Sequence, residues 1–210
     1  MTLEEYIQSE IIPLYDHFDM AHQRDHVLKV IEESMNLAQY YPVDKSMVYT
    51  IAAFHDTGLV KGRDTHHLIS GCIIREDRCL PQWFSRAQIE TMAQAAEDHR
   101  ASSDHEPRSI YGKIVAEADR DIIPHKIIRR TIQYGLSHYP QLDKEDHWKR
   151  TLDHLHEKYA EGGYLNLWIP ESNNALQLNH LRTIIKDEVQ LRQLFDTFFE
   201  LTLFFKFRNF

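Results

Sequence analysis

Apolar residues recur at helical spacing along most of this chain, and residues that can cap or end a helix separate the runs. Between residues 25 and 40 the apolar positions fall on one helical face, and Pro42 follows its end. Asp44 can cap the next helix, and Ser85 forms a capping box with Gln88. The pattern therefore predicts an all-α fold, a compact bundle of roughly eight to ten helices.

The same reasoning places the other elements. Thr2 can cap a short first helix, and a further helix is expected from Asp64 or Thr65 towards Arg78. Pro107 suits the first turn of a helix that runs to about Asp121. Residues 164–169 alternate between apolar and other side chains, which fits a short strand or an extended loop. Two more helices are expected between residues 173 and 205, and the length of the chain favours a single domain over 1–210.

Composition narrows the function. The formal net charge is −8, which argues against a nucleic-acid or anionic-membrane binder. Two cysteines exclude a disulfide scaffold and a cysteine-based zinc finger. Neither a signal peptide nor a long uninterrupted apolar stretch is visible, so we expect a soluble, cytoplasmic protein. The chain holds 14 histidines, and histidine is the commonest metal ligand.

Ligand-type residues recur near the buried faces of five predicted helices, as His26, His55 with Asp56, His67, His99 and Asp119. Burial of such groups without partners costs several kcal/mol each, and a divalent metal is the simplest shared partner. Imidazole with carboxylate suits Zn, Fe, Mn, Co or Ni. A lone inward histidine is more often a hydrogen-bonded core residue, and we assign that role, or simple exposure, to His66, His105, His125 and His147.

The ordered set resembles the HD-domain superfamily of metal-dependent phosphohydrolases over roughly residues 20–125. The local sequences that carry the resemblance are Asp25-His26-Val27, Phe54-His55-Asp56-Thr57-Gly58, His67-Leu68-Ile69-Ser70-Gly71, Asp98-His99-Arg100 and Glu117-Ala118-Asp119-Arg120-Asp121. The resemblance implies an HD metal-binding core at 20–125, and residues 126–210 then form a helical extension packed on it.

The resemblance also implies a ligand set for one metal, which consists of His26, His55, Asp56 and Asp119. In dinuclear members the aspartate of the His-Asp pair bridges to a second metal, and His67 and His99 match its ligands. Such members often carry a His-His pair where this chain has His99-Arg100, although His105 could substitute. We therefore expect one tightly held metal and a second that is weak or absent. No Gly-Tyr-Pro signature follows, which disfavours the cyclic-di-GMP phosphodiesterase subgroup.

The implied function is hydrolysis of a nucleotide or other small phosphorylated metabolite with a divalent metal (Mn, Fe, Ni, Co, Mg or Zn). Asp56 and Asp119 are the predicted catalytic residues, and Arg100 and Lys113 are predicted to bind the substrate phosphate. Glu117 and Asp121 flank Asp119 and are candidates to orient it. Two alternatives stay open: a di-iron oxygenase and a non-catalytic metal- or nucleotide-binding regulatory module. A homodimer is compatible with the sequence, which does not determine the oligomeric state.

Overall fold

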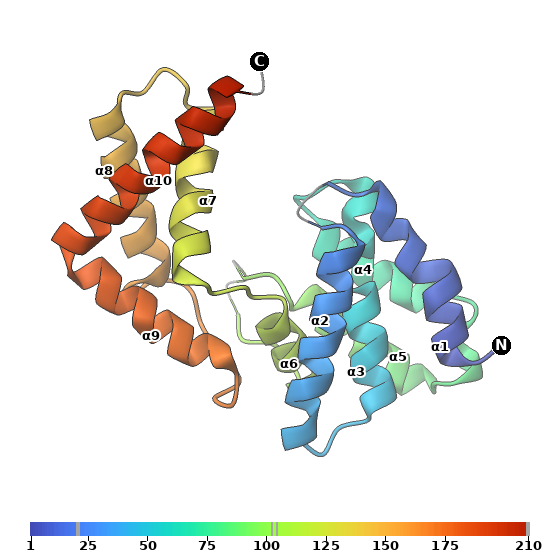
Figure 1. The fold of residues 1–210 in the computed structure, drawn as a ribbon. Helices are drawn as coiled ribbons and strands as arrows, with labels where there is room; N and C mark the ends of the chain where they lie inside the picture. Colours follow the sequence, from blue (N-terminus) through green and yellow to red (C-terminus); the bar gives the residue numbers. More distant parts are fainter. Residues whose placement is uncertain (20–21, 102, 104, 209–210) are drawn as a thin grey trace. The chain divides into compact units, whose positions relative to one another are not determined.

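The computed structural model describes residues 1–19, 22–101, 103 and 105–208, and this part of the chain contains helices and loops but no strand. Ten α-helices follow one another in these residues (Figure 1), which confirms the predicted all-α fold. They are α1 (Leu3–Tyr6), α2 (Arg24–Leu37), α3 (Lys45–Phe54), α4 (His66–Glu76), α5 (Arg86–Glu97), α6 (Ile110–Ala118), α7 (Pro124–His138), α8 (Lys144–Tyr159), α9 (Asn173–Lys186) and α10 (Glu188–Arg208). Two 3-10 helices bear on the site, η2 (Ile12–His17) and η4 (Thr57–Lys61).

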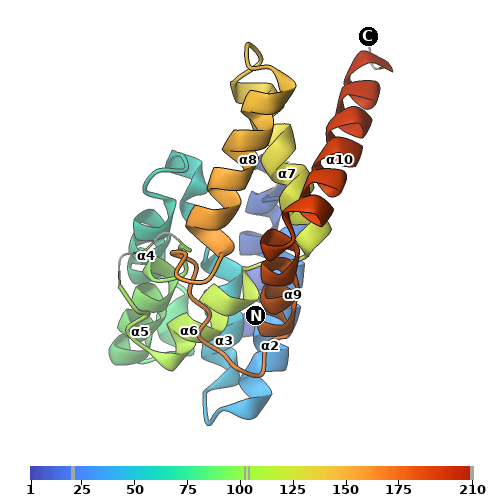
Figure 2. The same ribbon diagram turned by 90° about the vertical axis from the view of Figure 1, so that its left-hand side faces the viewer.

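The helices form two compact units. The first unit comprises Met1–Arg120 together with Leu167–Ser172, and the second comprises Asp121–Asn166 and Asn173–Phe210. In the first unit, α2 packs against α3 and α6, and α5 packs against α3, α4 and α6. In the second unit, α7 packs against α8 and α10 (Figure 2). No helix in the described ranges combines the length and the apolarity needed to cross a membrane.

Helix α3 is the centre of the first unit because its residues are apolar on almost every side. Met47, Val48, Ile51 and Phe54 are all buried, and Val30 of α2 is buried in the same core. A helix of this kind has to be covered by its neighbours rather than face water. Helices α2, α5 and α6 supply this cover.

The predicted caps form as expected at three helices. Asp44 accepts the backbone N–H of Ser46 at 2.9 Å, and Ser85 and Gln88 form a reciprocal capping box at the start of α5. Thr2 and Glu5 form a second capping box at α1. These side chains satisfy backbone donors that a helix leaves unpaired at its first turn.

Helix α6 begins later than the sequence suggested, at Ile110 rather than at Pro107. The Ser109 hydroxyl caps it by accepting the Gly112 N–H at 3.2 Å. The preceding backbone N–H, that of Arg108, is bound by the Asp98 carboxylate at 2.7 Å instead. The side-chain cap and this competing acceptor outweigh the preference of proline for a first helical turn.

Residues 164–169 form an extended loop and not a strand. The end of this loop lies in the first unit, where the fully buried Glu117 of α6 holds it. Glu117 accepts the Trp168 backbone N–H at 2.8 Å and the Ser172 hydroxyl at 2.5 Å. The buried carboxylate therefore fixes this loop to the helix that ends at Asp119.

Candidate metal centre

Six side chains from five helices meet at one place in the first unit, and each stands at a helix end or just beyond one. They are His26 in the first turn of α2, His55 at the C-cap of α3, Asp56 directly after it, His66 at the first position of α4, His99 directly after the C-cap of α5, and Asp119 at the C-cap of α6. The backbone leaves the helical path at Asp56 (φ −109°, ψ 5°), so His55 and Asp56 can both face one site although they are adjacent.

The Asp56 carboxylate lies between two pairs of histidines. Its Oδ2 atom is 3.3 Å from Nε2 of His55 and 3.6 Å from Nε2 of His26. Its Oδ1 atom is 3.3 Å from Nε2 of His66 and 3.4 Å from Nε2 of His99. We call His26, His55, Asp119 and Asp56 Oδ2 the first ligand set, and His66, His99 and Asp56 Oδ1 the second ligand set.

The spacing within each set suits a shared ion. Two ligand atoms about 2.0–2.1 Å from one tetrahedral ion lie about 3.3 Å apart. The Nε2 atoms of His26 and His55 are 3.3 Å apart, and those of His66 and His99 are 3.2 Å apart. Asp119 completes the first set, with its Oδ1 atom 3.3 Å from Nε2 of His26. The structure thus brings together all four residues predicted for the first metal.

Hydrogen bonds at the other ring nitrogens decide which atoms face the centre. Backbone carbonyls only accept, so a ring nitrogen that contacts one carries the proton. Three Nδ1 atoms do so, those of His55 with Ala52 O (2.8 Å), His66 with Arg63 O (2.6 Å) and His99 with Ala96 O (2.6 Å). In the neutral rings each Nε2 then presents a lone pair to the centre. Facing lone pairs repel unless a proton or a metal ion lies between them, and this second hydrogen bond is typical of metal-ligating histidines.

The ionisable side chains of the cluster shift one another's pKa values. Burial opposes ionisation of Asp56, but its contacts with His55, His26 and His99 hold its pKa well below the ordinary value. For His26, burial lowers the pKa, but Asp119 and Asp56 outweigh it and raise the pKa to about 9. A proton on His26 therefore balances part of the carboxylate charge, and a metal ion would have to displace that proton.

The structure corrects the sequence prediction for the second set, because His66 takes the position that was assigned to His67. Consecutive helical residues point about 100° apart, so only one of the two can face Asp56. His66 shares its face of α4 with Ser70, whose Oγ accepts the Gly58 N–H at 2.9 Å. His67 is four residues before Gly71, which packs closely against Glu97 of α5. His67 is therefore turned from the carboxylate towards α5.

An ion pair between a buried carboxylate and a partly exposed arginine fixes the turn that carries His99. Asp98, whose side chain is 1% exposed, accepts Nη2 of Arg108 at 2.8 Å and also the Arg108 backbone N–H. Arg108 donates further to Gln94 O at 3.0 Å and to Glu97 at 2.6 Å. The guanidinium thus clamps the last turn of α5 and closes the loop from His99 to the start of α6.

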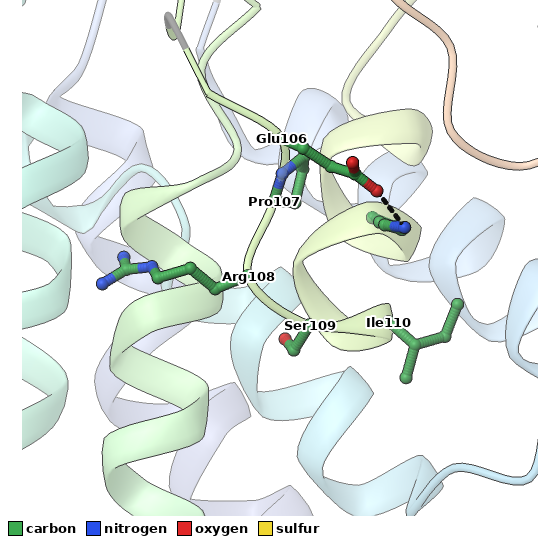
Figure 3. Close-up of a pocket in the computed structure, with 6 residues that line it drawn as sticks. Glu106, Pro107, Arg108, Ser109 and Ile110 are labelled. Carbon is green, nitrogen blue, oxygen red and sulfur yellow. Dashed lines mark ion pairs between the residues drawn. The ribbon is translucent and has the colours of Figure 1, made fainter.

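The two predicted phosphate-binding cations lie in different surroundings. Nη1 of Arg100 donates to Asp64 O at 2.8 Å, and Arg100 and His67 line a pocket of about 660 Å³. Lys113 pairs with Glu106 and lines a second pocket, of about 430 Å³. Figure 3 shows this pair, with the Arg108 side chain directed away from it. Arg100 directly follows His99 of the second ligand set in the sequence, whereas the Lys113 ammonium is already paired with a carboxylate.

The chain is similar to one protein family and to a solved structure. Residues 24–121 match the family model of the HD domain. Among solved structures, a crystal structure of a predicted HD superfamily hydrolase from an uncultured Thermotogales bacterium shares 24% sequence identity, with a TM-score of 0.47, over 73% of this chain and 90% of that chain. Comparison with curated proteins gives no match.

Proposed function

Because residues 24–121 match the family model of the HD domain, we propose that the protein is a metal-dependent hydrolase that acts on a phosphoric ester or anhydride of a nucleotide or other small metabolite. The observation that carries the proposal is the Asp56 carboxylate, whose two oxygens each face a pair of histidine Nε2 atoms at 3.3–3.6 Å. Buried lone pairs in this arrangement are costly without a cation and become ligands when one binds.

The donor atoms fit a divalent first-row metal. Imidazole nitrogen mixed with carboxylate oxygen suits Mn, Fe, Co, Ni or Zn, and Mg accepts such sites less readily because it prefers oxygen. The first ligand set offers four donors, and the second offers three. We therefore propose a tight site at His26, His55, Asp56 and Asp119, and a weaker one at His66, His99 and the other Asp56 oxygen.

A bound divalent ion would supply Lewis acidity and lower the pKa of a water molecule. The side chains of the protein would orient the water and bind the phosphate. Asp119, whose side chain is 25% exposed, could accept a hydrogen bond from an attacking water and orient it. The guanidinium of Arg100 has further N–H donors for phosphoryl oxygens, and His67 lines the same pocket. We propose that Arg100 binds the substrate phosphate. Lys113 could bind it only once its ammonium is no longer paired with Glu106.

A second candidate function rests on the two ligand sets. A di-iron oxygenase needs two metal sites that share a bridging group, and the two histidine pairs on opposite oxygens of Asp56 provide that arrangement. His66 takes the place expected for His67, and Arg100 still stands where dinuclear members often carry a further histidine. Oxygen consumption by the iron-loaded protein with candidate organic substrates distinguishes this activity from phosphate release.

The decisive experiment is metal analysis of the protein purified without chelator, combined with a panel of phosphorylated metabolites. We expect a stoichiometric divalent metal and release of phosphate or of a nucleoside product. Asp56→Ala removes the carboxylate common to both sets, so it should abolish hydrolysis and most metal binding. A fully metal-loaded, active Asp56→Ala protein would contradict the proposed role of this carboxylate.

A further inference from the structure

The Tyr15 hydroxyl makes two hydrogen bonds to the turn that carries His55 and Asp56. Tyr15 comes from η2, and its side chain is fully buried. The hydroxyl donates to Ala53 O at 2.9 Å and accepts the backbone N–H of Asp56 at 3.3 Å. One oxygen atom from a distant part of the chain therefore joins the two backbone groups on either side of His55.

This contact completes a cap at the end of α3. A helix leaves its last carbonyls without backbone partners, and here three consecutive ones are each bound by a side chain. The pairs are Ala52 O with His55 Nδ1, Ala53 O with the Tyr15 hydroxyl, and Phe54 O with the Thr57 hydroxyl. The first and third donors lie within the turn itself. The Tyr15 hydroxyl alone among the three comes from outside, so it sets where the turn lies relative to the rest of the unit.

We propose that Tyr15 is a positioning residue for Asp56, and this inference rests on the proposed metal-dependent function. Its hydroxyl fixes the Asp56 backbone amide, and the amide fixes the direction in which the carboxylate leaves the chain. That direction decides whether Oδ2 reaches His26 and His55 while Oδ1 reaches His66 and His99. A small rotation of the Asp56 backbone would lengthen contacts in both ligand sets at once.

The chemistry of the phenol fits this role. Burial raises the pKa of Tyr15 well above its ordinary value, and the nearby Asp56 carboxylate adds to the effect. The phenol is therefore neutral and keeps the proton that it donates to Ala53 O. Its ring packs edge-on against Phe18, with centroids 5.1 Å apart, so the hydroxyl is held in place by packing as well as by hydrogen bonds.

The test compares Tyr15→Phe with Tyr6→Phe. Each variant removes one hydroxyl from a buried tyrosine of the N-terminal segment, and the Tyr6 hydroxyl donates to Asp77 instead of the site. Zn²⁺ affinity is measured by competition with a chromogenic chelator. The absorption spectrum of the Co²⁺-loaded protein reports the ligand geometry. Thermal melting without metal reports the stability of each variant. We expect Tyr15→Phe to weaken Zn²⁺ binding about 10–100-fold and to shift the Co²⁺ bands, as is usual when a partner behind the ligands is lost. Tyr6→Phe should leave both at the wild-type values, although its melting temperature also falls.

Zn²⁺ affinity of Tyr15→Phe within twofold of wild type, with an unchanged Co²⁺ spectrum, overturns the inference and leaves the proposed function intact. Failure of the wild-type protein to bind Zn²⁺, Mn²⁺ or Co²⁺ overturns both. If Tyr15→Phe does not fold, hydrogen exchange of the Asp56 amide in the wild-type protein decides. Strong protection supports the inference, and exchange at the rate of an open loop refutes it.

Discussion

A single methyl group added at Gly58 should disturb the second ligand set and leave the first one able to bind metal. A Cβ atom built on Gly58 would lie 2.0 Å from His66 O and 2.7 Å from the Ser70 backbone nitrogen. Both are backbone atoms of α4, so no side-chain rotation can relieve the contact. Ordinary contacts begin at 3.4 Å, and Gly58→Ala therefore has to displace the first turn of α4 by about 1.4 Å.

A displacement of α4 disturbs the second ligand set first, because α4 carries His66. His66 is 3.3 Å from Asp56 Oδ1 and 3.2 Å from His99, and a shift of this size breaks the shared ligand geometry. None of the residues specific to the first set lies on α4. We expect overpacking to cost about 1–3 kcal/mol of stability. We also expect the misplaced His66 to lower kcat about 100-fold, since a 1 Å error in a catalytic group has effects of that order.

The assay measures metal stoichiometry by titration at saturating Mn²⁺ or Zn²⁺, together with hydrolysis of the best substrate from the panel. The matched control is Gly112→Ala in α6, where the added Cβ would meet Pro107 Cβ at 3.2 Å and Asp98 Cβ at 3.4 Å. These contacts require little movement, and alanine is a better helix former than glycine. Gly58→Ala should keep the tight metal and lose the weak one. If it retains both metals and wild-type kcat, the close approach of α4 does not position His66.

Three further predictions follow from other parts of the structure. His66→Ala should remove the weaker metal in the same titration. His67→Ala should keep both metals and raise KM only, because His67 lines the pocket beside Arg100. Equal metal loss in the two variants would refute the assignment of His66 to the second ligand set. Arg108→Ala leaves the buried Asp98 carboxylate without its partner, which should cost about 1–3 kcal/mol in denaturant unfolding and weaken the second metal, while Arg75→Ala, which leaves Glu97 paired with Arg108, should cost less than about 1 kcal/mol. His147 is buried, none of the described groups hydrogen-bonds its ring nitrogens, and burial together with Arg150 lowers its pKa below 6.5. The neutral form of His147 stabilises the protein fully above about pH 6.5, and this contribution is lost as the pH falls towards the lowered pKa. The melting temperature should therefore drop between pH 7 and 5. It should drop less in His147→Leu, which has no group to protonate at this position.

Much of this site could be predicted from the sequence because its residues continue the buried faces of their helices. His55 follows Ile51 by four positions and Asp119 follows Val115 by four, so both continue a buried stripe to the end of a helix. The caps at Asp44 and Ser85 could be predicted for the same reason, since each depends only on residues within one turn. Helical periodicity is enough to predict which way a residue at a helix end points when the side chains that surround the helix are apolar.

The choice between His66 and His67 could not be made in this way. Both stand in the first turn of α4, and both have a small residue four positions later, Ser70 or Gly71. The register is decided by the contact of His66 O with Gly58 and by the packing of Gly71 on Glu97, which join parts of the chain that are distant in sequence. A sequence motif records which residues are present, and it does not record the rotation of a helix about its axis.

The residues that hold the ligands in place also lack a sequence signal, for a physical reason. Ligands at helix ends stand beside unpaired backbone groups, and any nearby donor or acceptor can satisfy those groups wherever it lies in the chain. At the end of α3 the partner is a tyrosine about forty positions earlier, and at the end of α5 it is an arginine on the far side of a loop. Neither residue type is characteristic of metal sites. Apart from the choice between His66 and His67, the candidate ligands are therefore visible in the sequence, whereas the hydrogen bonds that set their directions become visible only when the helices are packed.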